Sequence, residues 1–277
     1  MVAALLLVAL HLVVQGGHPQ QPATTGASGA GLRAAPAAAD REVARTHPRG
    51  LRVVALGDSV TSGAACGCDA FPALYGRLLA QRTGVPVHVE NDGVNGLDSA
   101  GLRAGLGDTT SPVAGSVAAA DVVLVTIGAN DFSDHHDEVV ERRCLAAVDC
   151  VADEMAQLRT DIDDILVRTR ALRGGRPTAV LVTGYWNVFQ DGDVARALFH
   201  DEGLAAAVQL TRRTNTVIES AATANGATYV DLFGAFRRQR TGMTGLLAGD
   251  GDHPSASGHQ LIARVLMAAG LPGLSDR

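Results

Sequence analysis

The sequence predicts an α/β fold: a three-layer α/β/α sandwich in which a parallel β-sheet lies between two layers of helices. Short apolar segments alternate along the chain with longer segments that have helical periodicity. Strands that alternate with helices are joined by right-handed crossovers and therefore pair in parallel. The composition agrees, because 47% of the residues are hydrophobic and only 4% are aromatic, so Ala, Val and Leu must fill the core.

Five short apolar segments are the expected strands, and turn-forming residues such as Gly and Asn end several of them. They cover residues 51–56, 85–90, 121–127, 178–183 and 227–232. Four longer segments are the expected helices, at residues 71–83, 151–172, 204–224 and 257–269. In the helix at 151–172, the apolar residues form one stripe along its length: Val151, Met155, Leu158, Ile162, Ile165 and Leu172.

Three segments of different character divide the chain. Residues 1–17 contain an apolar run that ends near Val14, shorter than the roughly 20 residues that a membrane-spanning helix needs. This segment is typical of a signal peptide, although no basic residue precedes Arg33, and a membrane-anchor-like segment is the alternative. Residues 18–48, rich in Ala, Gly and Pro, are expected to be a flexible linker, and residues 49–277 the folded domain. We expect a secreted, extracellular protein, with association with the cell envelope as the alternative.

The charged residues exclude several classes of function. The formal net charge is −6, whereas a protein that binds nucleic acid needs a basic face. All 23 basic residues are Arg, and the chain contains no Lys. A Ser–Lys dyad, a Schiff-base lysine and a phosphate-loop lysine are therefore excluded.

Polar motifs follow three consecutive expected strands, and a fourth precedes the last helix. They are Gly57-Asp58-Ser59, Asn91 to Gly96, Gly128-Ala129-Asn130-Asp131 and Asp250-Gly251-Asp252-His253. Ligands of open parallel sheets bind beyond the carboxyl ends of the strands, so we expect the motifs to meet there. Taken singly, each motif is also explained by a turn, a helix cap or a solvated loop.

Together, the motifs supply every group that acyl transfer requires. Ser59 is the candidate nucleophile and His253 the candidate base. Asp250, three residues before the histidine, is the carboxylate expected to orient the ring, and Asp252 is its competitor.

The oxyanion of acyl transfer needs hydrogen-bond donors. The candidates are the backbone amides of Ser59 and Gly96 and the side-chain amide of Asn130. Gly93 is the alternative to Gly96.

These four motifs resemble the sequence blocks of the SGNH hydrolase family, the GDSL-type esterases and lipases. Ser59 matches the nucleophile of that family, Gly96 and Asn130 match its oxyanion residues, and Asp250 to His253 match its D-x-x-H motif. The resemblance spans the expected domain and implies a flavodoxin-like fold with a five-stranded parallel sheet. It also implies a serine hydrolase that cleaves carboxylic esters through an acyl-enzyme. The chain has no G-x-S-x-G, which disfavours the nucleophile-elbow class of hydrolases.

Two other functions stay open at this point. An acyltransferase could pass the acyl group to a carbohydrate hydroxyl with the same residues, and a non-catalytic cell-surface protein could use the scaffold for binding. We expect an ester substrate (a lipid, an acylated glycan or a small ester) and a monomer with no cofactor, no metal and no nucleic-acid partner. His135 and His136, between Asp134 and Asp137, are expected to lie in a solvated loop rather than to bind a metal ion.

Four cysteines in a chain that we expect to be exported indicate disulfides. We favour Cys144–Cys150, which closes a short loop, and Cys66–Cys68 then pairs by elimination; C-x-C is not a zinc spacing. The segment Thr183–Asp191 contains the only Trp and follows the fourth strand. It is expected either to line the acyl or alcohol pocket or to be fixed to the core by its aromatic side chains.

Overall fold

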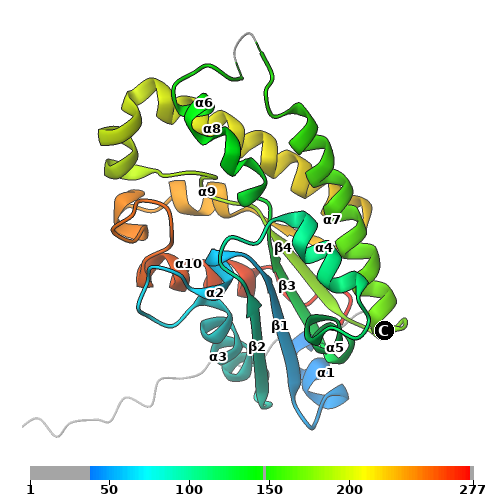
Figure 1. Ribbon diagram of the computed structural model, residues 1–277. Helices are drawn as coiled ribbons and strands as arrows, with labels where there is room; N and C mark the ends of the chain where they lie inside the picture. The colour runs from blue at the N-terminus through cyan, green and yellow to red at the C-terminus, as the bar shows by residue number, and fades with distance from the viewer. Residues whose placement is uncertain (1–37, 146–147, 275–277) are drawn as a thin grey trace, which may run out of the picture. The chain divides into compact units, whose positions relative to one another are not determined.

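Five strands form one parallel sheet with the order β2-β1-β3-β4-β5 (Figure 1). Their bounds are β1 (Leu51–Gly57), β2 (Val87–Gly93), β3 (Val122–Thr126), β4 (Ala179–Thr183) and β5 (Thr228–Val230). The computed structural model describes residues 38–145 and 148–274, so the expected signal peptide at 1–17 lies outside the described residues. The predicted five-stranded parallel sheet is confirmed.

The helices form a layer on each face of the sheet. On one face α3 packs against α1 and α10, and on the other α7 packs against α4, α5 and α8 (Figure 1). The bounds are α1 (Ala38–Thr46), α2 (Ser59–Ser62), α3 (Phe71–Thr83), α4 (Ser99–Gly107), α5 (Pro112–Ala119), α6 (His136–Val140), α7 (Ala152–Arg173), α8 (Gly192–Ala224), α9 (Leu232–Arg237) and α10 (Ala256–Ala268). Two short 3₁₀ segments, η1 (Asn130–His135) and η2 (Thr244–Leu246), complete the elements. The predicted α/β/α sandwich is thus confirmed.

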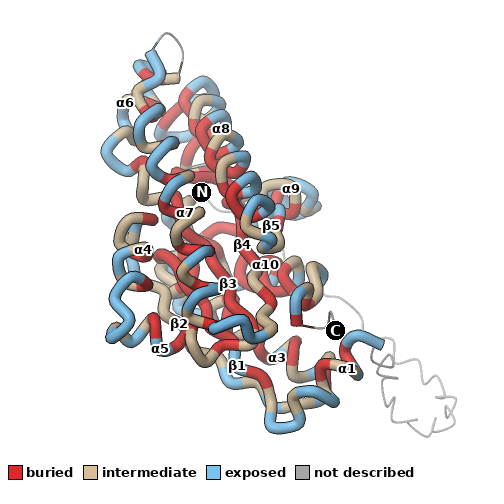
Figure 2. The backbone as a smooth tube through the Cα atoms, turned by 90° about the vertical axis from the view of Figure 1, so that its right-hand side faces the viewer, coloured by how far each residue is buried: buried red, intermediate tan, exposed pale blue. Residues whose placement is uncertain are grey.

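The core lies between the sheet and the two helix layers, where Figure 2 shows the buried backbone in red. All five residues of β3 are buried, as expected for a central parallel strand with helices on both faces. The apolar stripe of α7 contributes Leu158, Ile162 and Ile165, each of which is at most 1% exposed. None of the described helices has the length and apolar composition that crossing a membrane requires.

The first helix corrects the prediction of a flexible linker up to residue 48, because residues 38–46 are helical. Val43 of α1 is buried, and the carboxylate of Asp40 accepts a hydrogen bond from Arg82 Nε at 2.6 Å. Only one apolar side chain of α1 enters the core, so the segment has no apolar periodicity to reveal it. Its two leading alanines are nevertheless strong helix formers.

Two other element bounds differ from prediction. Strand β2 extends to Gly93, so the second polar motif starts inside the strand. Helix α8 begins at Gly192 and is interrupted at His200, which has a φ of 56°. The predicted helix at 204–224 is the part after this interruption.

Candidate active site

Ser59 is the first residue of the short helix α2, directly after β1. Asp58, not Ser59, caps this helix: its Oδ1 accepts the Val60 N–H at 2.9 Å. Gly57 precedes the cap with a φ of 146°, and a side chain there would collide with the Thr126 carbonyl of the neighbouring strand. The Ser59 hydroxyl has no hydrogen-bond partner among the described residues, so its position is set by the backbone rather than by a capping role.

The end of β2 and the loop after it are held against the Ser59 turn by three hydrogen bonds. Asn91 Nδ2 donates to the Thr61 carbonyl at 2.9 Å, the Val94 amide donates to the Gly57 carbonyl at 2.9 Å, and the Ser62 hydroxyl donates to Asn95. Because the register of the sheet pairs Gly57 with Gly93 and with Thr126, three strands end at the same level. The second motif is thereby placed beside the first.

The structure distinguishes the two glycines of this loop. The Gly93 amide donates to Asn91 Oδ1 at 3.1 Å, and its α-carbon packs against the backbone of α2. Gly96 has a φ of 76°, and no atom lies within 4 Å of the position that a side chain would take. The Gly96 amide has no partner among the described residues, so it is available to a ligand and the Gly93 amide is not.

Asn130 begins the 3₁₀ segment η1 after β3. Its Nδ2 donates to the Leu97 carbonyl at 2.8 Å, which leaves one N–H of the amide for another acceptor. The adjacent Asp131 carboxylate accepts the Ser99 amide at 3.1 Å and the Ser99 hydroxyl. Burial raises the pKa of Asp131, although the two bonds from Ser99 oppose that shift. These contacts join the third motif to the second.

His253 and Asp250 form a hydrogen-bonded pair in the loop before α10. Nδ1 of His253 lies 2.7 Å from Asp250 Oδ2, whereas the nearest oxygen of Asp252 is 3.9 Å away. Asp250 Oδ1 also accepts the backbone amides of Asp252 at 3.0 Å and His253 at 3.1 Å. Burial alone would raise the pKa of Asp250, but the hydrogen bonds from these amides and from the His253 ring outweigh it, and the pKa lies below its ordinary value. His253 Nε2 has no partner among the described residues.

The segment after β4 connects the Ser59 turn to the His253 loop. The Tyr185 hydroxyl donates to Asp58, and Trp186 Nε1 donates to the Asp252 carbonyl at 3.2 Å. Both side chains are only 1% exposed, and Trp186 stacks on Phe236 with ring centroids 4.5 Å apart. Attachment to the core, one of the two expectations for this segment, therefore describes these two aromatic residues.

Asp58 is the most unusual titratable group beside Ser59. It is 1% exposed, and burial raises its pKa to about 6, against the opposing hydrogen bonds from Tyr185 and the Val60 amide. The charges of Asp252 and His253 also act on Asp58, so the His253 loop lies within electrostatic reach of the residue next to Ser59. The Tyr185–Asp58 contact could not be predicted from the sequence, since 127 positions separate the two residues.

A cavity of about 700 Å³ lies between α6 and α8. Its lining is mixed: Val140, Leu198 and Phe199 are apolar, whereas His136 and the charged residues Asp137, Glu141, Arg142 and Glu202 line the rest. The charge of His136 acts on Asp252, whose pKa burial raises, so this side of the cavity is close to the His253 loop. The His136 ring also contacts Phe189 edge-on, with centroids 4.8 Å apart.

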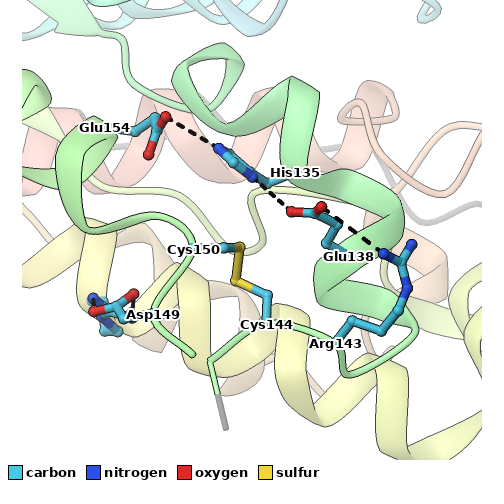
Figure 3. Close-up of a disulfide and its surroundings, with 8 residues drawn as sticks. His135, Glu138, Arg143, Cys144, Asp149, Cys150 and Glu154 are labelled. Carbon is cyan, nitrogen blue, oxygen red and sulfur yellow. Dashed lines mark hydrogen bonds and ion pairs between the residues drawn. A yellow bond between two sulfur atoms is a disulfide. The ribbon is translucent and has the colours of Figure 1, made fainter. Parts of the chain in front are cut away.

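The two adjacent histidines of η1 and α6 have separate partners. His135 lies between Glu138 and Glu154, at 3.0 and 3.1 Å, and the hydrogen bonds with Glu138 and then Glu154 raise its pKa (Figure 3). His136 lies 2.8 Å from Asp137. The two rings therefore face different partners, and they lie in η1 and α6 rather than in the loop that the sequence predicts.

The structure pairs Cys144 with Cys150, whose Cα atoms are 5.5 Å apart, and Cys66 with Cys68, at 5.1 Å (Figure 3 shows the first pair). The first pair links the end of the α6 region to the start of α7. The second lies in the loop between α2 and α3.

Comparison with known proteins identifies the class. Residues 55–261 match the model of the GDSL-like lipase/acylhydrolase family, which covers well over half of the chain. No curated protein sequence matches the chain. The protein belongs to the GDSL-like lipase/acylhydrolase family, and it is an SGNH-type carboxylic ester hydrolase, as the sequence motifs predict.

Solved structures share the fold at low sequence identity. The lipase Lip_vut3 from a goat rumen metagenome is 19% identical with a TM-score of 0.66, and the match covers 81% of this chain and 99% of that one. Phospholipase A1 from Streptomyces albidoflavus is 24% identical with a TM-score of 0.59, covering 79% and 99%. The extracellular lipase from Streptomyces rimosus is 21% identical with a TM-score of 0.57, also covering 79% and 99%.

Proposed function

We propose that this esterase acts through a Ser59–His253–Asp250 triad and an acyl-enzyme intermediate. The observation that carries the proposal is the set of unsatisfied groups beyond the carboxyl ends of the strands. The Ser59 hydroxyl, the Gly96 amide and His253 Nε2 have no partner among the described residues, while the groups around them are hydrogen-bonded. Gly96 is exposed and Ser59 and His253 are partly exposed, so a substrate can reach these three groups from solvent.

The proposed reaction begins with proton transfer from Ser59 to His253 Nε2 as the serine oxygen attacks the ester carbonyl carbon. The hydrogen bond of Asp250 to Nδ1, 2.7 Å long, fixes the ring orientation and stabilises the imidazolium. The protonated His253 then gives its proton to the departing alcohol. Water, activated by the same ring, hydrolyses the acyl-enzyme and restores the Ser59 hydroxyl.

The negative charge of the tetrahedral intermediate is proposed to lie on an oxygen held by the amides of Ser59 and Gly96 and the free N–H of Asn130. Support comes from the hydrogen bonds that fix these donors beforehand. Asn130 is oriented by its bond to the Leu97 carbonyl, and the Gly96 loop is oriented by its bonds to the Ser59 turn. Donors that are fixed before the reaction need no reorganisation when charge develops.

We assign the acyl chain to the cavity between α6 and α8. The apolar part of its lining, formed by Val140, Leu198 and Phe199, can contact a hydrocarbon chain, and its side at His136 is near the His253 loop. A cavity of about 700 Å³ can hold more than an acetyl group. The substrates proposed are therefore esters of medium or long acyl chains, with export from the cell as the setting; the similar Streptomyces rimosus enzyme is an extracellular lipase.

The test is hydrolysis of p-nitrophenyl esters from acetate to long acyl chains by the wild type and by Ser59→Ala. We expect turnover that increases beyond acetate and is lost in the variant, with mass spectrometry detecting an acyl adduct on Ser59 in the wild type. Leu198→Trp should reduce turnover of the long chains and spare acetate. Turnover by Ser59→Ala equal to that of the wild type would refute the triad. Product formation only with added acceptor alcohols would favour an acyltransferase.

A further inference from the structure

The loop between α2 and α3 contains a Cys-Gly-Cys motif that the ester chemistry does not use. The structure pairs Cys66 with Cys68 across the single residue Gly67, with their Cα atoms 5.1 Å apart. Gly67 is exposed, so thiols in solution can approach the pair. The residue before the ring, Ala65, has a φ of 59°, a conformation that residues with a side chain seldom adopt.

A buried histidine lies beside the two sulfurs. His259 of α10 is fully buried, and one of its ring nitrogens and the sulfurs of Cys66 and Cys68 all lie within 4.8 Å of one another. Its Nδ1 accepts the Phe71 amide N–H at 3.2 Å. Burial, and then the charge of His253, lower the pKa of His259 to about 4. The ring is therefore neutral at pH 7, with its proton on Nε2.

The position of this proton decides whether His259 and the two cysteines suit metal binding or thiol chemistry. The Nε2–H is buried and has no partner among the described residues, which leaves a hydrogen-bond donor unsatisfied. A metal ion would need a free nitrogen lone pair, but Nδ1 already accepts an amide and Nε2 carries the proton. A thiolate, by contrast, is an acceptor that such a donor stabilises. The arrangement therefore suits thiol–disulfide chemistry better than metal binding.

The pair Cys144 and Cys150 offers a contrast within the same molecule. It spans six positions, and Cys144 is only 2% exposed. Its neighbour His135 is hydrogen-bonded to Glu138 and Glu154, so its ring nitrogens already have partners (Figure 3). Carboxylates near a thiol also disfavour the thiolate. The carboxylate beside the first pair, Asp69, is paired with Arg77 at 2.7 Å, which offsets its charge. This second pair has the features of a structural disulfide.

We propose that Cys66 and Cys68 form a redox-active pair that exchanges with low-molecular-weight thiols, with His259 as the group that stabilises the leaving thiolate. A thiolate in solution attacks one sulfur, a mixed disulfide forms, and the other cysteine leaves as a thiolate that accepts the His259 N–H. A second external thiolate attacks the mixed disulfide and releases the oxidised external disulfide and the second cysteine thiolate. Two electrons pass to the pair, and solvent supplies the protons that the two cysteines take up. This proposal does not depend on the triad.

The test equilibrates the purified, folded protein in glutathione buffers of graded ratio, alkylates the free thiols and locates them by peptide mass spectrometry. We expect Cys66 and Cys68 to become reduced at a ratio of reduced to oxidised glutathione at least about tenfold lower than Cys144 and Cys150 require. The second pair is the control, because it experiences the same buffer and the same fold. Equal resistance of both pairs to reduction would overturn the proposal.

The role of His259 is tested on the reduced protein through the pH dependence of alkylation. In the wild type we expect the midpoint for Cys66 or Cys68 below the ordinary thiol value of about 8.5. His259→Leu removes the donor and should move that midpoint upward, with exchange slowed about tenfold, while His259→Gln, which keeps an N–H, should restore much of both. If His259→Leu fails to fold, the wild-type midpoint decides alone: a value at or above the ordinary one contradicts the assignment.

Discussion

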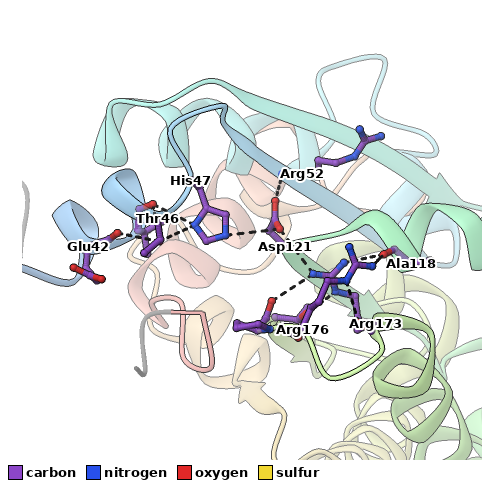
Figure 4. Close-up of polar contacts among 11 residues, drawn as sticks. Glu42, Thr46, His47, Arg52, Ala118, Asp121, Arg173 and Arg176 are labelled. Atoms are coloured by element: carbon purple, nitrogen blue, oxygen red, sulfur yellow. Dashed lines mark hydrogen bonds and ion pairs between the residues drawn. The ribbon is translucent and has the colours of Figure 1, made fainter.

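The two ends of the parallel sheet differ in whether their polar groups have hydrogen-bond partners. Beyond the carboxyl ends, the Ser59 hydroxyl, the Gly96 amide and His253 Nε2 have no partners among the described residues. Before the amino ends, Asp121 accepts the Arg52 amide at 2.9 Å and lies 3.8 Å from Arg173 (Figure 4).

At the amino ends, the described polar groups at the centre of the network have partners. The Arg173 side chain is only 4% exposed and donates to the Thr178 hydroxyl at 2.6 Å and the Ala118 carbonyl at 2.9 Å. His47 lies 3.9 Å from Asp121. Saturated polar groups stabilise the fold, whereas groups without partners are available to a substrate. Substitutions at the two ends should therefore affect different measurements.

The largest expected effect comes from exchanging the same residue type at each end. His253→Gln should lower kcat by on the order of 10⁴–10⁶, as loss of a catalytic base does elsewhere, with little change in the thermal midpoint. His47→Gln, the matched control, should leave kcat within about threefold of the wild type, because its ring contacts only the amino-end network. Ester hydrolysis and calorimetry of both variants measure this. Similar losses of kcat in the two variants would remove the distinction between the ends.

The next largest effect is expected on stability, from the loss of the buried Arg173 side chain. Arg173→Met should lower the free energy of unfolding by about 3–5 kcal/mol, because Asp121 loses its charged partner and buried carbonyls lose donors. Turnover per folded molecule should stay unchanged. Urea denaturation and active-site titration with a serine-reactive phosphonate separate the two quantities. A variant of wild-type stability would show that the network contributes little.

A smaller effect is expected at the carboxyl ends, from the loss of Asn130, the proposed oxyanion donor. Asn130→Ala should lower kcat by on the order of 10²–10³ with a modest change in KM, since the donor acts mainly on the transition state. Asn225→Ala is the matched control: that amide donates to Asp163 at 2.7 Å, at the end of α8. Steady-state kinetics on a single ester provide the measurement. If Asn130→Ala raised KM alone, the amide would bind the ground state instead.

The smallest effect is a change in how stability depends on pH. The pKa of Asp58 rises from 3.8 to about 6, so its contribution to stability is complete below pH 3.8 and is lost as pH rises through 6. The pKa of His259 falls from 6.5 to about 4, so its contribution is complete above pH 6.5 and is lost as pH falls through 4. The two slopes oppose each other in the wild type.

Asp58→Asn removes one of these slopes and keeps an oxygen that can accept the Val60 amide. The stability of the variant should therefore rise with pH between 4 and 6 relative to the wild type, by about 3 kcal/mol across the window, from a shift of about two pKa units at about 1.4 kcal/mol each. Urea midpoints at intervals of pH measure the difference. Parallel curves for the two proteins would mean that Asp58 has an ordinary pKa.

The sequence predicted the sheet and the placement of the four motifs because both depend on local signals. Apolar runs mark strands, and Gly57 and Gly128 mark their ends. The pairing of His253 with Asp250 follows from a spacing of three residues, which one turn of chain can close. Local signals do not decide between Gly93 and Gly96 as the candidate oxyanion donor, since the decision depends on which backbone amide already has a hydrogen-bond partner.

The contacts between residues far apart in the sequence could not be predicted, because the folded chain alone brings these residues together. Tyr185 reaches Asp58 from the far side of β3, and His259 reaches Cys66 and Cys68 from a helix nearly two hundred residues away. Helix α1 was missed for a different reason: its stability depends on one buried side chain and one ion pair with Arg82 rather than on periodicity. Such tertiary contacts leave no local pattern in the sequence.

The adjacent residues Tyr185 and Trp186 have a consequence for how the protein loses activity on heating. One holds Asp58 beside the nucleophile, and the other holds the Asp252 carbonyl beside His253. Neither loop can open by itself without breaking a buried bond to the same dipeptide. The proposed nucleophile Ser59 and the proposed base His253 should therefore lose their alignment in one cooperative step, and their backbone amides should exchange with deuterium at a common rate.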